Sequence, residues 1–299
     1  MLQSWEHLLH ITFVALYLPG LPRAADPPRS RWRLVDHAMR QQIDAPPAEA
    51  LRSAGMWLEA GIISEVGLWD SALAVCASGR AISPVSAGYP AKWLQLSFAP
   101  PALWIAGEEL PHPKSIMAIV GSRALSAAAA RFAREAARAV GEAGSALISG
   151  GASGADREAA RGIIRWAAEA EVSVPLIQIV PFGIGRLDRR ALAWERGVAG
   201  CVLSLAAPEE GFSSALAMER NALLYAAAER SLVVAARLRE GGTWAGATAA
   251  LRRRSTSMFV REDGSPSCRA LEALGASPLK CAASFPSAEP AQSQMRLVG

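Results

Sequence analysis

Short apolar runs alternate with longer amphipathic stretches from residue 116 onward. Residues 116–120 form an apolar run that ends at Gly121, and residues 125–144 then repeat alanine, phenylalanine and valine at three- and four-residue spacing, with arginines on the other side. This is the pattern of a strand followed by an amphipathic helix. The same unit recurs, with strands predicted at 146–149, 175–180, 200–204, 231–235 and 256–260, and helices at 156–169, 188–196, 214–228, from about 243, and at 266–275.

Strands that alternate with helices of these lengths favour right-handed crossovers and a parallel sheet covered on both faces. We therefore predict an α/β fold class, a Rossmann-like doubly wound parallel sheet, within a domain spanning residues 86–280. The polar stretch at 281–299 is predicted to be a disordered tail.

The first part of the chain has a different pattern, since proline pairs such as Pro27-Pro28 and Pro46-Pro47 interrupt it. Proline removes a backbone donor and restricts its predecessor, so no long element crosses these points. Residues 31–42 and 48–61 are predicted helices, residues 8–18 a buried N-terminal helix, and residues 89–107 an extended lead-in carrying aromatic anchors. Residues 1–85 are thus predicted to form a small, mostly helical N-terminal module.

The composition limits the class of protein. Of the 299 residues, 51% are apolar and 19% charged, which is typical of a globular chain and not of a disordered one. The four cysteines, Cys76, Cys201, Cys268 and Cys281, form no CxxC pair. This spacing argues against a zinc site or disulfide framework and favours a reducing compartment. No stretch reaches the length of a membrane span, so we expect a cytoplasmic protein with no membrane association and no metal.

The charge is unevenly distributed. Residues 1–115 carry 9 Lys and Arg against 10 Asp and Glu, so the remaining residues carry 22 against 17 of the totals of 31 and 27. Almost all the basic residues are arginines, whose guanidinium suits bidentate phosphate contacts. A GC-rich genome would give the same bias toward alanine and arginine, so charge alone favours a nucleic-acid partner only weakly.

Turns at the carboxyl ends of parallel strands are the first candidates for ligand binding. Gly121, Ser122 and Arg123 follow the first predicted strand, where a tight turn, backbone donors and a helix N-terminus predict a phosphate site. The alternative is an ordinary connection between strand and helix. A glycine-rich loop follows the second strand and carries the candidates Ser149, Gly150, Gly151, Gly154 and Asp156. It lacks the lysine of a P-loop, which argues against nucleotide hydrolysis.

Two later segments add candidates. Arg220 and Asn221 lie on the predicted helix 214–228 and are candidates for phosphate contact or for solvated surface. Gly241, Gly242 and Thr243 follow strand 231–235, where Thr243 can cap a helix or bind a phosphate. Trp244 is a candidate for either the core or a base-stacking surface.

No catalytic set emerges from these residues. The last histidine is His112, so the alternating strands and helices from residue 116 onward lack the commonest general base. We predict a binding protein without catalytic residues and without a cofactor.

In order along the chain, Tyr89-Pro90, residues 118–123 (AIVGSR), residues 149–156 (SGGASGAD), Arg220-Asn221 and residues 274–276 (LGA) resemble the DNA-processing protein A family (DprA/Smf). The resemblance implies a protein that binds single-stranded DNA and helps to load a RecA-type recombinase during natural transformation, through a Rossmann-like domain that can form a homodimer. It implies that Arg123 contacts phosphate. By the same resemblance the pocket is shaped by Gly121, Ser122, Ser149, Gly150, Gly154 and Asp156, with Arg220 and Asn221 also carried over. The loop at 241–244 departs from the family's usual turn. The chain departs from the family at Ala160, where a histidine is usual, and at residues 222–228.

Two alternatives remain open. One is a nucleotide-binding protein or a nucleoside-monophosphate phosphoribohydrolase of the lysine-decarboxylase-like Rossmann group, which the Gly241-Gly242-Thr243 turn resembles. The other is a structural or protein-binding module in which the glycine loops are only turns. Titration with DNA and with mononucleotides distinguishes the three.

Overall fold

The computed structural model describes residues 5–16, 32–86, 89–96, 99–107, 115–172, 176–187 and 200–287. The chain forms two compact units. The first comprises Met1–Ala106, Phe182–Arg186 and Leu203–Gly211, and the second comprises Gly107–Pro181, Leu187–Val202 and Phe212–Gly299. The first unit therefore extends beyond residue 85 and takes in two short later segments.

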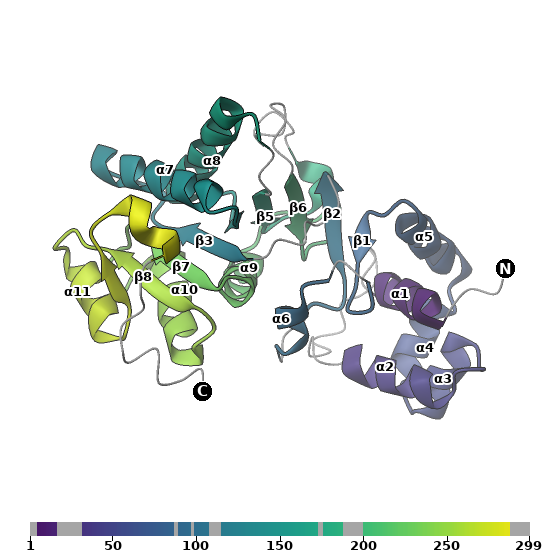
Figure 1. Ribbon diagram of the computed structural model, residues 1–299. Coiled ribbons are helices and arrows are strands. Elements are labelled where there is room, and N and C mark those ends of the chain that lie inside the picture. Colours follow the sequence, from purple (N-terminus) through teal and green to yellow (C-terminus); the bar gives the residue numbers. More distant parts are fainter. Residues whose placement is uncertain are drawn as a thin grey trace. The chain divides into compact units, whose positions relative to one another are not determined.

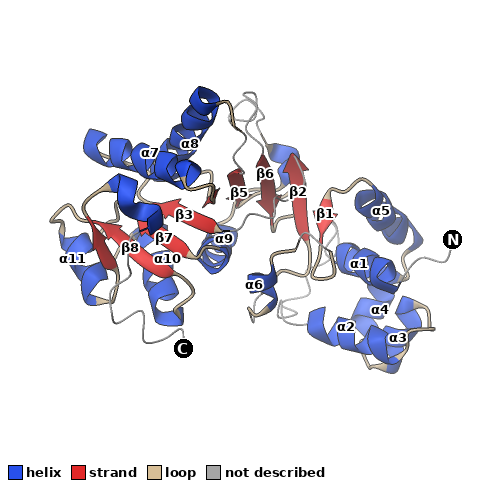
Figure 2. Ribbon diagram, viewed as in Figure 1, coloured by secondary structure: helices blue, strands red, loops and turns tan. Residues whose placement is uncertain are grey.

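The second unit is built on a parallel sheet (Figures 1 and 2). Its strand order is β6 (Gly200–Ser204), β5 (Leu176–Val180), β4 (Ala146–Ser149), β3 (Ile116–Val120), β7 (Arg230–Val233), β8 (Ser257–Arg261) and β9 (Ser277–Leu279). The pairings from β5 through β9 are all parallel. The chain adds strands outward from β3 in one direction up to β6, and then returns to place β7 on the other side of β3. The order therefore reverses between β3 and β7.

Helices cover both faces of this sheet, because alternate strand residues point to opposite sides. Met117, Ile119 and Leu232 pack in a core with the alanine-rich helices α7 (Ala127–Glu142) and α8 (Ala155–Ala170). Val120 and Val233 pack in a second core with residues of α9 (Ser214–Ala227), α10 (Gly241–Arg253) and α11 (Pro266–Ala273). The predicted doubly wound α/β class is confirmed.

The predicted strands and helices of this unit agree with the structure to within a few residues at their ends. Serine caps explain where several helices begin, since Ser126, Ser213 and Ser265 each accept a hydrogen bond from the backbone N–H three residues on. The predicted helix at 188–196 lies outside the described residues. The short strand β9 was not predicted.

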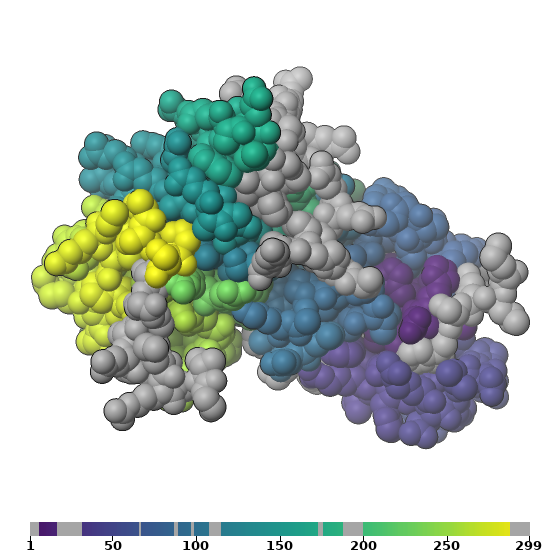
Figure 3. Space-filling model, in the orientation of Figure 1, coloured from purple at the N-terminus to yellow at the C-terminus, as the bar shows by residue number. Residues whose placement is uncertain are grey.

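The prediction of a disordered tail from residue 281 is wrong for its first residues. Ala282–Ser287 form a 3₁₀ helix, η4, which packs on α7; Figure 3 shows η4 in yellow against α7 in teal. Phe285 is fully buried and meets Phe259 edge to face, with ring centroids 5.9 Å apart. Ala282 is buried as well, so these two side chains anchor the segment on the core. Residues 288–299 lie outside the described residues.

The first unit is mostly helical. Its helices are α1 (Trp5–Leu16), α2 (Trp32–Gln41), α3 (Pro47–Ser53), α4 (Trp57–Ile63), α5 (Val66–Ala77) and α6 (Ala91–Leu94), with the 3₁₀ turn η2 (Ile184–Arg186). The strands β1 (Ala81–Ile82) and β2 (Leu103–Gly107) pair in antiparallel fashion. Phe13, Leu51 and Trp104 lie in its core. The predicted buried N-terminal helix is thus confirmed as α1.

Two predictions for this unit are corrected. The helix predicted at 48–61 is two helices, α3 and α4, because the chain turns at Gly55 with φ +73°. Residues 89–107 are not simply extended, since they include α6 and β2, and the Tyr89 hydroxyl donates a hydrogen bond to the Pro100 carbonyl at 2.7 Å. No single helix among the described residues is long and apolar enough to cross a membrane. Helix α4 and residues 67–77 together reach that length and apolar character, but the chain bends by 75° between them.

Candidate functional site

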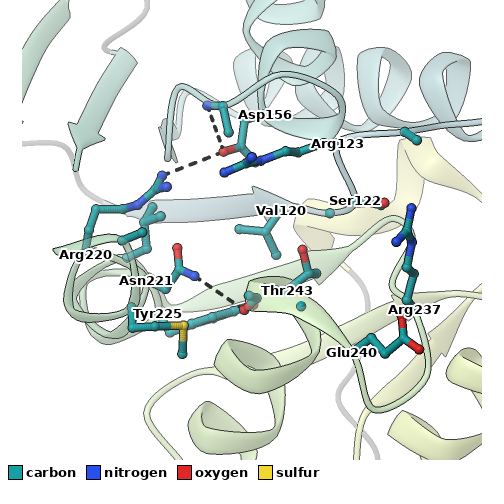
Figure 4. A pocket seen from close by; sticks show the side chains of 18 residues that line it. Val120, Ser122, Arg123, Asp156, Arg220, Asn221, Tyr225, Arg237, Glu240 and Thr243 are labelled. Atoms are coloured by element: carbon teal, nitrogen blue, oxygen red, sulfur yellow. Dashed lines mark hydrogen bonds and ion pairs between the residues drawn. The ribbon is translucent and has the colours of Figure 1, made fainter. Parts of the chain in front are cut away.

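A cavity of about 440 Å³ opens where the strand order reverses, at the carboxyl ends of β3 and β7 (Figure 4). Ligands in open α/β sheets bind at such switch points, because two loops diverge there. The cavity is lined by nine of the thirteen candidate residues: Gly121, Ser122, Arg123, Asp156, Arg220, Asn221, Gly241, Gly242 and Thr243. The structure therefore brings together residues from four separate segments of the sequence.

The turn after β3 is fixed by close packing. A Cβ at Gly121 would lie 2.7 Å from the Cβ of Ala155 and 3.2 Å from the carbonyl oxygen of Ala235, so only glycine fits. The backbone N–H of Ser122 donates to that same carbonyl at 2.8 Å. Arg123 follows with an exposed side chain. The sheet thus presents one arginine at a set position beside the cavity.

The glycine-rich loop supports this turn, and of its residues 149–156 Ala152 and Asp156 line the cavity. The N–H of Ala155 donates to the Ser122 carbonyl at 3.3 Å. Gly154 has φ +85°, and a Cβ there would overlap the Ser122 carbonyl and lie 2.6 Å from Arg123 Cα. The other three loop candidates, Ser149, Gly150 and Gly151, also lie outside the lining. Gly154, Ser149, Gly150 and Gly151 thus belong to the layer of residues that supports the cavity wall and do not face the cavity.

Asp156 and Arg220 form a buried pair beneath the cavity. Arg220 Nη1 lies 3.8 Å from Asp156 Oδ2, and both residues are only 6% exposed. Asp156 Oδ2 accepts a hydrogen bond from the N–H of Ala152 at 3.2 Å. Burial raises the pKa of Asp156 to about 6, although the Arg220 charge opposes this shift. Burial also lowers the pKa of Arg220, with Asp156 opposing it. For both groups the effect of burial on the pKa thus exceeds the opposing effect of the partner's charge.

The hydrogen-bonding capacity of Arg220 is not filled. Its Nε and Nη1 are buried, and neither donates a hydrogen bond to any acceptor in the described part of the chain. Figure 4 shows the Arg123 side chain running alongside Asp156 toward this guanidinium. Buried donors without acceptors are rare in folded proteins and cost free energy. The site is therefore suited to an anionic ligand.

The opposite wall is the start of α10. Glu240 precedes the helix and its side chain makes no capping hydrogen bond. Gly241 takes φ +75°, and Asn221 Nδ2 donates to the Gly242 carbonyl at 3.4 Å, which ties α9 to this turn. Thr243 also lines the cavity. The first N–H groups of a helix lack partners within it and carry partial positive charge, so this wall also attracts anions.

Several lining residues were not predicted as site residues, among them Arg237, Glu240, Met218 and Tyr225. Arg237 could have been found, because it follows β7 just as Arg123 follows β3. Burial raises the pKa of the Tyr225 phenol, and nothing local in the sequence distinguishes this tyrosine from a core residue. Trp244 is half-buried, packs against the core around Tyr225 and does not line the cavity, so its interpretation as a core residue is favoured and its role in base stacking stays a prediction.

The charged groups that line this site are mostly basic. Its charged lining groups are three guanidiniums and two carboxylates. In the part of the chain that the structure describes, no group of three or more His, Cys, Asp or Glu residues is placed to hold a metal ion.

Comparison with known proteins gives one family. The model of the family "DNA recombination-mediator protein A" matches residues 80–285. No curated protein matches the sequence. Among solved structures, DNA processing protein A from Streptococcus pneumoniae is 18% identical, with 97% of this chain and 99% of that chain covered and a TM-score of 0.69.

A second similar structure is DNA processing protein A from Helicobacter pylori, reported for its single-stranded DNA binding mode. It is 20% identical, with 66% of this chain and 90% of that chain covered and a TM-score of 0.57. At these identities the two structures support the same fold.

Proposed function

The chain belongs to the DNA recombination-mediator protein A family, and from this premise we propose that it binds single-stranded DNA through the cavity at the β3 and β7 strand ends. Its role is then in DNA processing and recombination, as the names of the family and of the two similar structures indicate. The observation that carries the proposal is the convergence of Arg123, Arg220, Arg237 and the uncapped start of α10 on one cavity.

Arg123 is the residue that we expect to contact the backbone phosphates. It is exposed and follows a turn that packing holds in place, so its guanidinium can reach a backbone phosphate beside the cavity and bind it through paired hydrogen bonds. Contacts to phosphates position a strand but carry no sequence information. We therefore expect binding that is nearly independent of base sequence and strongly dependent on salt.

We further propose that the protein binds DNA without cleaving it. The second unit contains no histidine beyond His112, which lies in its first residues, outside the described part, and is the last in the sequence. The pocket carboxylates are Asp156, which is paired with Arg220, and Glu240, which precedes α10. This arrangement supports binding more than acid–base chemistry.

The resemblance to the family supports a finer proposal, in which the protein loads a RecA-type recombinase onto the strand during natural transformation, acts in the cytoplasm and forms a homodimer. A recombinase assay on single strands coated with a single-strand-binding protein tests it. Faster recombinase filament formation in the presence of the protein supports the proposal, and an unchanged rate contradicts it.

The test of DNA binding is fluorescence anisotropy of a labelled single strand, with duplex of the same sequence for comparison, at several salt concentrations. Arg123→Ala is compared with Arg252→Ala, because Arg252 is exposed in the last turn of α10, at the far end from the cavity. Both variants lose one positive charge. Only Arg123→Ala is expected to flatten the slope of log affinity against log salt, by about 0.7 for the removal of one single-strand phosphate contact.

Equal slopes for the two variants would remove Arg123 from the binding site. No binding of either DNA form by the native protein would refute the proposal, and nucleoside monophosphates would then be tested as ligands or substrates.

A further inference from the structure

The buried guanidinium of Arg220 is the part of the site that phosphate binding at the surface leaves unexplained. Arg220 is 6% exposed, yet it lines the cavity, and its Nε and Nη1 have no hydrogen-bond acceptor among the described residues. Its ion pair with Asp156, at 3.8 Å, is too long to be a hydrogen bond. The guanidinium is therefore held in place by charge while two of its donors remain unused.

The cavity carries more positive charge than one backbone phosphate needs. Among its lining residues, Arg123, Arg220 and Arg237 outnumber Asp156 and Glu240 by one charge. The helix α10 begins at the cavity without a side-chain cap. Such a helix end contributes about half a positive charge, so the excess is about one and a half charges. A backbone phosphodiester carries one negative charge, whereas a phosphate monoester carries about 1.5 to 2 at neutral pH.

The charges lie on two sides of the cavity. Figure 4 shows Arg220 and Asp156 on one side, and Arg237 with Glu240 on the other, near Thr243. The volume of about 440 Å³ is within the range of pockets that hold small organic molecules, so it exceeds what a bare phosphate fills. A phosphate bound to Arg220 thus leaves room for the sugar and base attached to it.

We propose that this cavity receives a nucleotide phosphate monoester, whose oxygens bind the guanidinium of Arg220 where it lines the cavity. This inference rests on the proposed DNA binding and specifies it. The phosphate monoester is either the terminal phosphate of a DNA strand or the phosphate of a free nucleotide. Arg123, at the exposed edge, then contacts the next phosphate of the strand.

The experiment compares three oligo-dT strands of equal length with an internal fluorescent label: one with a 5′-phosphate, one with a 3′-phosphate, and one with hydroxyls at both ends. Hydrogen bonds between a charged terminal phosphate and Arg220 are expected to tighten binding by roughly tenfold or more. The phosphorylated end that binds more tightly identifies the orientation of the strand. Competition by dTMP then shows whether a free nucleotide enters the same cavity.

Two variants connect the effect to the named residues. Arg220→Lys keeps the positive charge but removes the planar fork of donors, so the ratio of affinities between phosphorylated and hydroxyl strands is expected to fall toward one. Arg237→Gln changes a residue outside the buried pair and is expected to lower the same ratio without affecting folding. Arg252→Ala is the control and should retain the full ratio. Thermal unfolding verifies that each variant is folded.

The outcomes separate the two proposals. Equal affinity of the native protein for all three strands overturns the monoester site while DNA binding stands. Binding of dTMP without binding of any strand overturns the DNA-binding proposal and retains the monoester site. Tighter binding of a phosphorylated strand that survives both Arg220→Lys and Arg237→Gln also overturns the assignment.

Discussion

Substitution of Gly150 by alanine tests whether the glycine-rich loop exists to make room for the buried arginine. A Cβ at this position would overlap Arg220 Nη1 and lie 2.6 Å from Asp156 Oδ2. Gly150 is not among the residues with positive φ, so its backbone suits any residue and the effect comes from lost space alone. Alanine at this position therefore has to displace the guanidinium.

The magnitude follows from two opposing effects. Inserting a methyl group into a well-packed interior costs about 1–3 kcal/mol, while replacing glycine in an allowed conformation contributes about 0.4–1 kcal/mol of stability through the unfolded chain. A net loss of roughly 1–2 kcal/mol is expected for Gly150→Ala. The matched control is Gly151→Ala. Gly151 has φ +66°, but its Cβ would come no closer than 3.6 Å to Gln178, so the cost of roughly 1–2 kcal/mol is backbone strain.

The two variants should therefore lose similar stability and differ in binding. Urea denaturation measures the first quantity, and anisotropy with a single-stranded oligonucleotide measures the second. Gly150→Ala is expected to weaken binding by roughly tenfold, as loss of one charge-assisted hydrogen bond would, whereas Gly151→Ala should bind within about twofold of the native protein. Native affinity in Gly150→Ala would refute the assignment of a binding role to the position of Arg220.

Three further predictions concern pH, packing and thiols. Burial raises the folded-state pKa of Asp156 to about 6 from 3.8, so the folded protein takes up more protons than the unfolded chain in that interval and gains stability as pH falls through it. Asp156→Asn should flatten that part of the stability curve in denaturation at several pH values, and an unchanged curve would contradict the shift. Phe285→Ala should cost about 3–5 kcal/mol in chemical denaturation, because the ring is fully buried; a cost near zero would show that η4 does not contribute to the core. Burial raises the pKa of the Cys201 thiol to about 12, so a thiol reagent should modify the exposed Cys281 in the native protein and Cys201 only after unfolding; equal rates would exclude this burial.

The fold of the second unit could be predicted because its signals are local. Apolar runs such as 116–120 are buried on both faces, and their lengths and spacing follow directly from the βαβ unit. Elements whose order depends on distant contacts could not be found in this way. The strand β9 is three residues long and contains a proline, and η4 is ordered by Phe285 packing on Phe259.

The site could be predicted only in part, for a similar reason. The rule that ligands bind after strand ends identifies Arg123 and the Gly241–Thr243 turn from the sequence. It does not give the strand order, and the order decides which two strand ends enclose the cavity. The reversal between β3 and β7 brings the α9 residue Arg220 beside Asp156 of α8, a pairing across 64 positions of sequence that no local motif contains.

The glycines show how a correct motif can have a different physical cause from the one expected. In a loop of this composition, glycine is expected to let the backbone approach a ligand closely. Here the side-chain space at Gly150 is taken by Arg220, and that at Gly154 by the Ser122–Arg123 backbone. Substitution of either glycine therefore acts on the ligand indirectly, by moving an arginine. It follows that the loop can change its sequence at position 153, which does not line the cavity, without loss of binding, provided that the space at positions 150 and 154 is kept.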